Sequence, residues 1–194
     1  PMHLDLGHVA VFRGLIKGAG ITADIESDLF SILQSKDNAA LKELCVGLKK
    51  RLSKRVCEAL MVLPELYGDR KVLQQAHKIL PKYPEIQIAL DELETVEKEL
   101  KSVVDTIAFD LADLRGYHYH TGMVFAAYAK GSSNAIALGG RYDEIGKAFG
   151  RARPATGFSM DLRELARLVK PTPYPKGILA PYKKKNKAYD YSHY

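Results

Sequence analysis

The sequence predicts an α+β fold in which an antiparallel sheet is flanked by helices and carries a small helical insertion. Two observations lead to this prediction. Apolar residues recur at helical spacing from Thr22 to about residue 107, and from Phe109 onward they recur at every second residue. Short glycine-containing links separate the later alternating stretches, which is typical of antiparallel strands.

The first 84 residues predict a short strand, a helix and then a group of small helices. His3 to Leu6 alternates polar and apolar residues, and residues 9–17 have the period of a helix that is closed by Gly18 and Gly20. Four short helices follow: Asp24 and Asp37 are predicted to cap the first two, Pro64 to stop the third, and residues 72–80 to form the fourth. Short helices joined by short links indicate a small helical insertion.

The remaining elements follow the change of period. A long amphipathic helix is predicted over residues 86–107, where it would lie along the sheet. Strands are predicted over residues 109–114, 117–129 and 134–138, with Gly139-Gly140 breaking the third; a short helix over 142–148, a strand over 156–159 and a last helix over 162–169 complete the set. The predicted domains are therefore residues 1–21 with 85–170, an insertion over 22–84, and a tail or truncated segment over 171–194.

Composition narrows the class of protein. The 194 residues carry a net charge of +6, and much of it comes from lysines close to the C-terminus (Lys176, Lys183, Lys184, Lys185 and Lys187). These lysines favour a solvated tail over an RNA-binding arm, because nucleic-acid-binding proteins usually spread cations over a face or groove. No apolar run is long enough to span a membrane, and no secretory signal is visible. Cys45 and Cys57 lack metal-binding spacing, so we expect reduced thiols, no bound metal and a cytoplasmic protein.

Two motifs carry side chains suited to a small ligand. In the segment Arg115 to Phe125, an arginine suited to a carboxylate precedes several tyrosines and histidines. As a strand, it would place Tyr117 and Tyr119 on one face and His118 and His120 on the other. By themselves these residues favour an aromatic-rich sheet edge over a ligand site, and a zinc site lacks an evident third ligand. The second motif, Gly139-Gly140-Arg141-Tyr142-Asp143, is either a turn or a close approach of the backbone to a ligand.

The motifs in this order resemble the C-terminal half of the histidyl-tRNA synthetase catalytic domain, a class II synthetase fold. Residues 115–125 are similar to that family's histidine motif, typically R-G-L-D-Y-Y-x-x-T-V-F-E. Residues 139–143 match its G-G-R-Y-D, and residues 157–165 are similar to its motif 3, typically G-F-A-M-G-L-E-R-L. The resemblance covers roughly residues 1–170 and implies a synthetase-like fold.

Departures from the motifs decide which branch of the family the chain resembles. The motif 3 arginine that holds ATP phosphates is Glu164 here, and the glutamate before it is Arg163. A carboxylate repels phosphates, so aminoacylation is not expected. The closing glutamate of the histidine motif is Ala126, and its Asp and second Tyr are His118 and His120. These features are similar to the paralogous regulatory subunits of short-form ATP phosphoribosyltransferase.

That resemblance implies a subunit with no catalytic residues or cofactor of its own. It would assemble, as a homodimer within a hetero-oligomer, with the short catalytic subunit that joins ATP to phosphoribosyl pyrophosphate in the first step of histidine biosynthesis. It would be required for activity and would confer feedback inhibition by histidine; tRNA binding is not expected. The residues carried over to a histidine site are Arg115, Tyr119, His120, Gly139, Gly140, Arg141 and Tyr142. An active histidyl-tRNA synthetase and a stand-alone amino-acid-binding domain stay open as alternatives.

Overall fold

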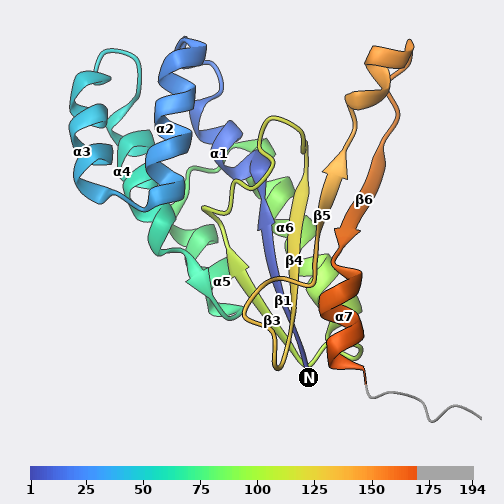
Figure 1. The fold of residues 1–194 in the computed structure, drawn as a ribbon. Coiled ribbons are helices and arrows are strands. Elements are labelled where there is room, and N and C mark those ends of the chain that lie inside the picture. The colour runs from blue at the N-terminus through green and yellow to red at the C-terminus, as the bar shows by residue number, and fades with distance from the viewer. Residues whose placement is uncertain (170–194) are drawn as a thin grey trace, which may run out of the picture.

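The computed structural model describes residues 1–169 as a six-stranded sheet with helices packed on one face and at one end (Figure 1). The tail predicted over residues 171–194, with its lysines, lies outside the described residues. The strands are β1 (Met2–His8), β2 (Tyr67–Gly68), β3 (Thr106–Asp110), β4 (Met123–Ala129), β5 (Ala137–Tyr142) and β6 (Ala155–Met160). The helices are α1 (Val9–Ile16), α2 (Ala23–Ser35), α3 (Asn38–Gly47), α4 (Lys54–Val62), α5 (Lys71–Ile79), α6 (Pro84–Leu100) and α7 (Leu162–Leu168), with short 3₁₀ helices η1 (Leu63–Glu65) and η2 (Ile145–Phe149).

The α+β class is confirmed, but the sheet is mixed and not purely antiparallel. The strand order is β2-β3-β1-β4-β5-β6, and β1 runs parallel to β3 while the other neighbours are antiparallel. Two parallel strands need a long crossover connection. Here the whole segment from α1 to α6 forms that connection, so β3 enters the sheet from the same end as β1.

Helix α6 covers one face of the sheet, as expected for the long amphipathic helix, and packs against β1 and β4 (Figure 1). Its buried side chains, Ile86, Leu90 and Leu93, join the same core as Leu4 and Leu6 of β1. The helix ends at Leu100 and not near residue 107, because β3 begins at Thr106. Within residues 1–169, none of the helices combines the length and apolarity that crossing a membrane requires.

Helices α2, α3 and α4, in the segment predicted as the insertion, each begin at a residue whose side chain caps the helix. The side chain of Asp37 caps α3 as expected, accepting hydrogen bonds from the backbone N–H groups of Ala39 and Ala40. The cap predicted for the preceding helix is wrong by two residues: Thr22 caps α2, and Asp24 lies in its first turn. Residues 67–68 pair with β3, so part of this segment extends the sheet. The domain boundaries themselves stay a prediction.

The cysteines lie in this helical segment. Cys45 is buried and Cys57 is half-buried, and both are free thiols. Burial raises the pKa of Cys45 to about 12, so this thiol stays protonated at neutral pH.

The segment from Leu111 to Gly122 is a loop, so the strand predicted over residues 109–114 lies instead at 106–110, and the one predicted over 117–129 begins only at Met123. Two aspartates turn the backbone here. Asp110 accepts a hydrogen bond from Ala112 N at 2.9 Å, and Asp113 accepts one from Arg115 N at 3.1 Å. Side chains that bond the backbone two residues on favour turns over extended strands. Strand alternation therefore does not apply to Tyr117 and its neighbours.

Gly139 and Gly140 lie inside β5 and do not break it, so that prediction is wrong. Both glycines pair across β4 and β6, in register with Phe125, Val124, Phe158 and Gly157. Glycine is required because a Cβ on Gly139 would lie 2.4 Å from the carbonyl oxygen of Gly157. The glycine pair thus allows close strand packing beside the loop.

Burial of His8 makes the stability of the fold sensitive to pH. Its side chain is 4% exposed; Nδ1 caps α1 and Nε2 lies 3.0 Å from the Glu92 carboxylate. Burial lowers the pKa of His8 below its ordinary value of 6.5, although Glu92 acts in the opposite direction. Between these two pKa values the unfolded chain binds more protons, so the free energy of unfolding should fall as the pH drops below about 6.5.

Urea unfolding at pH 7.5 and pH 5.5 checks this expectation. We expect the wild-type protein to lose more stability on acidification than the His8→Asn variant, in which an asparagine can still cap α1. Equal losses in the two proteins would contradict it.

Candidate functional site

The loop 111–122 is held firmly although it is irregular. Leu111, Leu114 and Tyr117 are buried, and Leu111 N donates to the carbonyl oxygen of Leu66 at 3.0 Å. At the far end, Thr121 N donates to the carbonyl oxygen of Arg141 at 2.9 Å. The loop is therefore fixed to the sheet at both ends and can hold side chains in defined positions.

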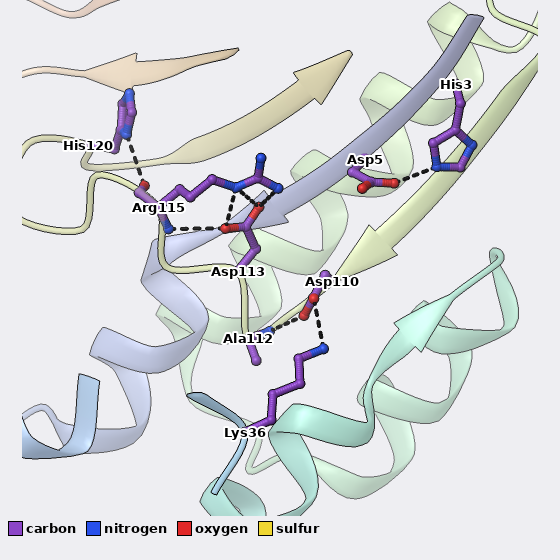
Figure 2. Close-up of polar contacts among 8 residues, drawn as sticks. All are labelled: His3, Asp5, Lys36, Asp110, Ala112, Asp113, Arg115 and His120. Atoms are coloured by element: carbon purple, nitrogen blue, oxygen red, sulfur yellow. Dashed lines mark hydrogen bonds and ion pairs between the residues drawn. The ribbon is translucent and has the colours of Figure 1, made fainter. Parts of the chain in front are cut away.

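Arg115 is the charged residue that this loop presents beside the sheet. Figure 2 shows its guanidinium directed at Asp113, with Nη2 2.7 Å and Nε 2.9 Å from the carboxylate oxygens. Burial lowers the pKa of Arg115, but the Asp113 carboxylate and the Tyr128 hydroxyl outweigh it and leave that pKa above its ordinary value. Arg115 is thus a fixed cation whose charge is already paired.

His120 occupies a space that two glycines create. Its Nδ1 lies 3.2 Å from the carbonyl oxygen of Arg115, so the proton on Nδ1 donates there and Nε2 remains an acceptor (Figure 2). A Cβ on Gly116 would lie 2.5 Å from Nδ1, and a Cβ on Gly140 would lie 2.7 Å from Cδ2. The ring therefore fits only because neither position carries a side chain.

A cavity of about 550 Å³ opens beside this ring, a size within the range of small-molecule sites. Its aromatic wall is formed by Tyr119 and Tyr142, whose ring centroids are 4.8 Å apart, with the Tyr119 ring also edge-on to His120 at 5.3 Å. The complete lining comprises Arg115, Gly116, Tyr119, His120, Phe125, Leu138, Gly139, Tyr142, Gly157, Phe158 and Ser159.

Five of the seven residues predicted for a histidine site line this cavity: Arg115, Tyr119, His120, Gly139 and Tyr142. Gly140 and Arg141 instead line a second cavity of about 480 Å³, against α6. The Arg141 guanidinium lies 3.1 Å from Asp143 and 3.8 Å from Glu92. Gly140 still serves the first cavity indirectly, because it leaves room for His120.

Sequence reasoning missed several lining residues. Gly116, Phe125, Leu138, Gly157, Phe158 and Ser159 all line the cavity without having been predicted as ligand-site residues. Most of them come from β4, β5 and β6, whose register brings them together. Asp113 was also missed, although its spacing of two residues before an arginine was a usable signal.

The charges around the cavity suit a small zwitterion better than a polyphosphate. Arg115 is the one lysine or arginine among the described residues that line it, and Asp113 already neutralises that charge. Neither Arg163 nor Glu164 is among the lining residues, and Glu164 pairs with Arg167. Within residues 1–169, no three histidine, cysteine, aspartate or glutamate side chains are grouped so as to hold a metal ion.

Comparison with known proteins shows the family to which the chain belongs. Residues 1–165 match the family described as Histidyl-tRNA synthetase, so the chain belongs to that family. A solved structure described as an ATP phosphoribosyltransferase regulatory subunit/histidyl-tRNA synthetase from Bacillus halodurans has a similar fold, with a TM-score of 0.71 and 26% identity over 88% of this chain and 45% of that one. The synthetase-like fold expected from the motifs is confirmed.

Within the family, the most informative relatives are regulatory subunits. The chain is 67% identical, over 96% of its length, to the ATP phosphoribosyltransferase regulatory subunit of Nitrosospira multiformis, and 63% identical, over 94%, to that of Nitrosomonas eutropha. It covers 48% and 47% of those proteins, so it spans about half the length of these relatives. The resemblance to this branch that the motif departures indicated is confirmed.

Proposed function

We propose that the protein containing this chain is the non-catalytic regulatory subunit of ATP phosphoribosyltransferase, and that it binds histidine in the cavity beside His120. The names of the relatives support the subunit role. The observation that carries the ligand is the cavity itself, where a paired arginine lies beside an aromatic wall. A free N–H edge of Arg115 suits the histidine carboxylate, and the two tyrosines suit an imidazole ring.

The acceptor nitrogen of His120 adds specificity to this arrangement. Its Nδ1 proton is committed to the carbonyl oxygen of Arg115, so Nε2 is free to accept an N–H from a ligand imidazole. A site built to pair with such an N–H rejects analogues that lack it, because the acceptor is then left unpaired.

Regulation requires more than binding. Histidine can inhibit only if it binds two states of the assembly unequally, one of them competent to activate the short catalytic subunit. We propose that this subunit is the partner, within a cytoplasmic hetero-oligomer that contains a homodimer of the regulatory chain. The mass of the co-purified complex tests the assembly.

The substitution Arg115→Lys tests the ligand site. Lysine keeps a cation next to Asp113 but lacks the planar fork that binds a carboxylate. In the complete complex we expect phosphoribosyl transfer to persist, and the histidine concentration for half-inhibition to rise on the order of 10- to 100-fold.

The matched control is Arg55→Lys, on the exposed side of α4 and outside the cavity. It should leave inhibition unchanged. Unaltered inhibition in the Arg115→Lys complex would exclude the proposed ligand site.

The family match also supports a second function, an active histidyl-tRNA synthetase. The carboxylate of Glu164 at the position of the phosphate-binding arginine disfavours it. Histidine-dependent exchange between ATP and pyrophosphate by the intact protein would establish the synthetase activity and exclude the non-catalytic role.

A further inference from the structure

The contact between Asp113 and Arg115 is more specific than an ordinary surface ion pair. One carboxylate oxygen of Asp113 accepts from both the backbone N–H of Arg115, at 3.1 Å, and its Nε, at 2.9 Å. The other oxygen lies 2.7 Å from Nη2. The Asp113 side chain is 8% exposed, whereas that of Arg115 is 39% exposed. The nearly buried carboxylate of Asp113 therefore binds the guanidinium of Arg115, which remains accessible to solvent.

Asp113 is itself held in place by the backbone around it. Its neighbours Ala112 and Leu114 are buried in the core. The β1 backbone approaches so closely at Gly7 that a Cβ there would lie 3.1 Å from the Cβ of Asp113. The carboxylate consequently has little freedom to follow the arginine, and the arginine must follow the carboxylate.

The pairing decides which edge of the guanidinium is left for a ligand. Asp113 uses the Nε hydrogen and one Nη2 hydrogen, so the two Nη1 hydrogens and the second Nη2 hydrogen stay free of this pair, and the Tyr128 hydroxyl is close enough to the guanidinium to raise its pKa. These free hydrogens form the end-on edge of the planar fork, which can take a carboxylate in a bidentate manner. Without Asp113, the long side chain would sample several rotamers, and this edge would not be fixed.

We propose that Asp113 is a positioning residue that fixes Arg115 with its end-on edge toward the carboxylate of the amino-acid ligand. This inference rests on the proposed histidine site and names the residue on which its recognition of the carboxylate depends. Asp113 does not touch the ligand; it acts through Arg115.

The test compares histidine with histidinol, in which an alcohol replaces the carboxylate, in the complete complex with its catalytic subunit. Binding is measured by calorimetry for wild type, Asp113→Asn and Asp113→Glu. In Asp113→Asn we expect histidine to bind on the order of 10- to 100-fold more weakly. The ion pair that orients Arg115 is lost, and with it the charge-assisted contact between Arg115 and the ligand carboxylate. Histidinol affinity should change by less than about twofold, because it makes no ion pair with Arg115. Asp113→Glu keeps the charge and should lie between wild type and Asp113→Asn for histidine.

Each outcome decides a separate question. A wild-type complex that binds neither compound refutes the proposed function itself. A wild-type complex that binds histidine, with Asp113→Asn unchanged, overturns the positioning role. Equal weakening of histidine and histidinol also overturns it, because that result indicates general damage to the cavity. If Asp113→Asn does not fold, the ratio of the two affinities in Asp113→Glu decides, and a wild-type ratio refutes the inference.

Discussion

Replacing Gly116 by alanine should destabilise the fold by about 2–4 kcal/mol, because two costs act together. The residue has φ of +61°, a backbone conformation that disfavours any side chain. In addition, the new Cβ would lie 2.5 Å from Nδ1 of His120 and 2.8 Å from its Cε1. The ring cannot retreat freely, since Gly140 lies against its other side.

A double-mutant cycle separates the two costs. In a His120→Ala background the ring clash is gone, so Gly116→Ala should cost only about 1–2 kcal/mol, the backbone component. Gly20 supplies a matched control because it has the same φ of +61° and nothing within 4 Å of the position of a Cβ. Gly20→Ala should therefore cost about the same in both backgrounds.

Urea unfolding of the four proteins of the cycle, with the Gly20 pair beside them, gives the coupling free energy. A coupling below about 0.5 kcal/mol between positions 116 and 120 would show that the ring does not depend on the glycine. Histidine inhibition should also weaken in Gly116→Ala, because the shifted ring would no longer present Nε2 to the cavity.

The glycines explain what the sequence could and could not reveal about the site. Arginine and tyrosine at positions 115 and 119 were predictable from the motif, and both line the cavity. The role of Gly140 was not predictable, because its contact with His120 joins β5 to a loop that only the folded chain brings beside it. Arg141 directly precedes Tyr142 in sequence but lines a different cavity, because alternation in β5 turns neighbouring side chains to opposite faces.

The elements of the fold that depend on local sequence signals were also predictable, whereas the long-range strand pairing was not. Helices α1, α3 and α4 follow local periodicity and capping, as Asp37 illustrates for α3. The parallel pairing of β1 with β3 joins residues about 100 positions apart, and no local pattern specifies it. The loop 111–122 was misjudged because alternating apolar residues suggested strands, whereas the side chains of Asp110 and Asp113 turn the backbone.

Tyr117 packs helices α1 and α2 against the loop that lines the cavity. Its loss should have the largest effect on both the stability of the fold and the binding of histidine. The residue is 2% exposed, and its ring lies 5.3 Å from that of Phe12 in α1 and 5.5 Å from that of Phe30 in α2. The Arg13 guanidinium stacks on the ring at 4.6 Å, and the tyrosine hydroxyl donates to Glu26. Burial, together with Glu26, raises the pKa of Tyr117 above its ordinary value, so the hydroxyl remains a neutral donor.

We expect Tyr117→Ala to lower the free energy of unfolding by about 3–5 kcal/mol, as for other buried aromatic side chains. Tyr117→Phe keeps the rings in contact and removes only the hydrogen bond to Glu26, so it should cost about 1 kcal/mol. Histidine binding should follow the same order, because Tyr117 anchors the loop that carries Arg115, Tyr119 and His120.

Unfolding and calorimetric titration of the two variants together check this link. If Tyr117→Ala lost stability as expected yet bound histidine like wild type, the cavity would not depend on the helical segment. If both quantities fall together in Tyr117→Ala and stay close to wild type in Tyr117→Phe, the packing of one aromatic ring between α1, α2 and the loop is what holds the ligand-binding residues in place.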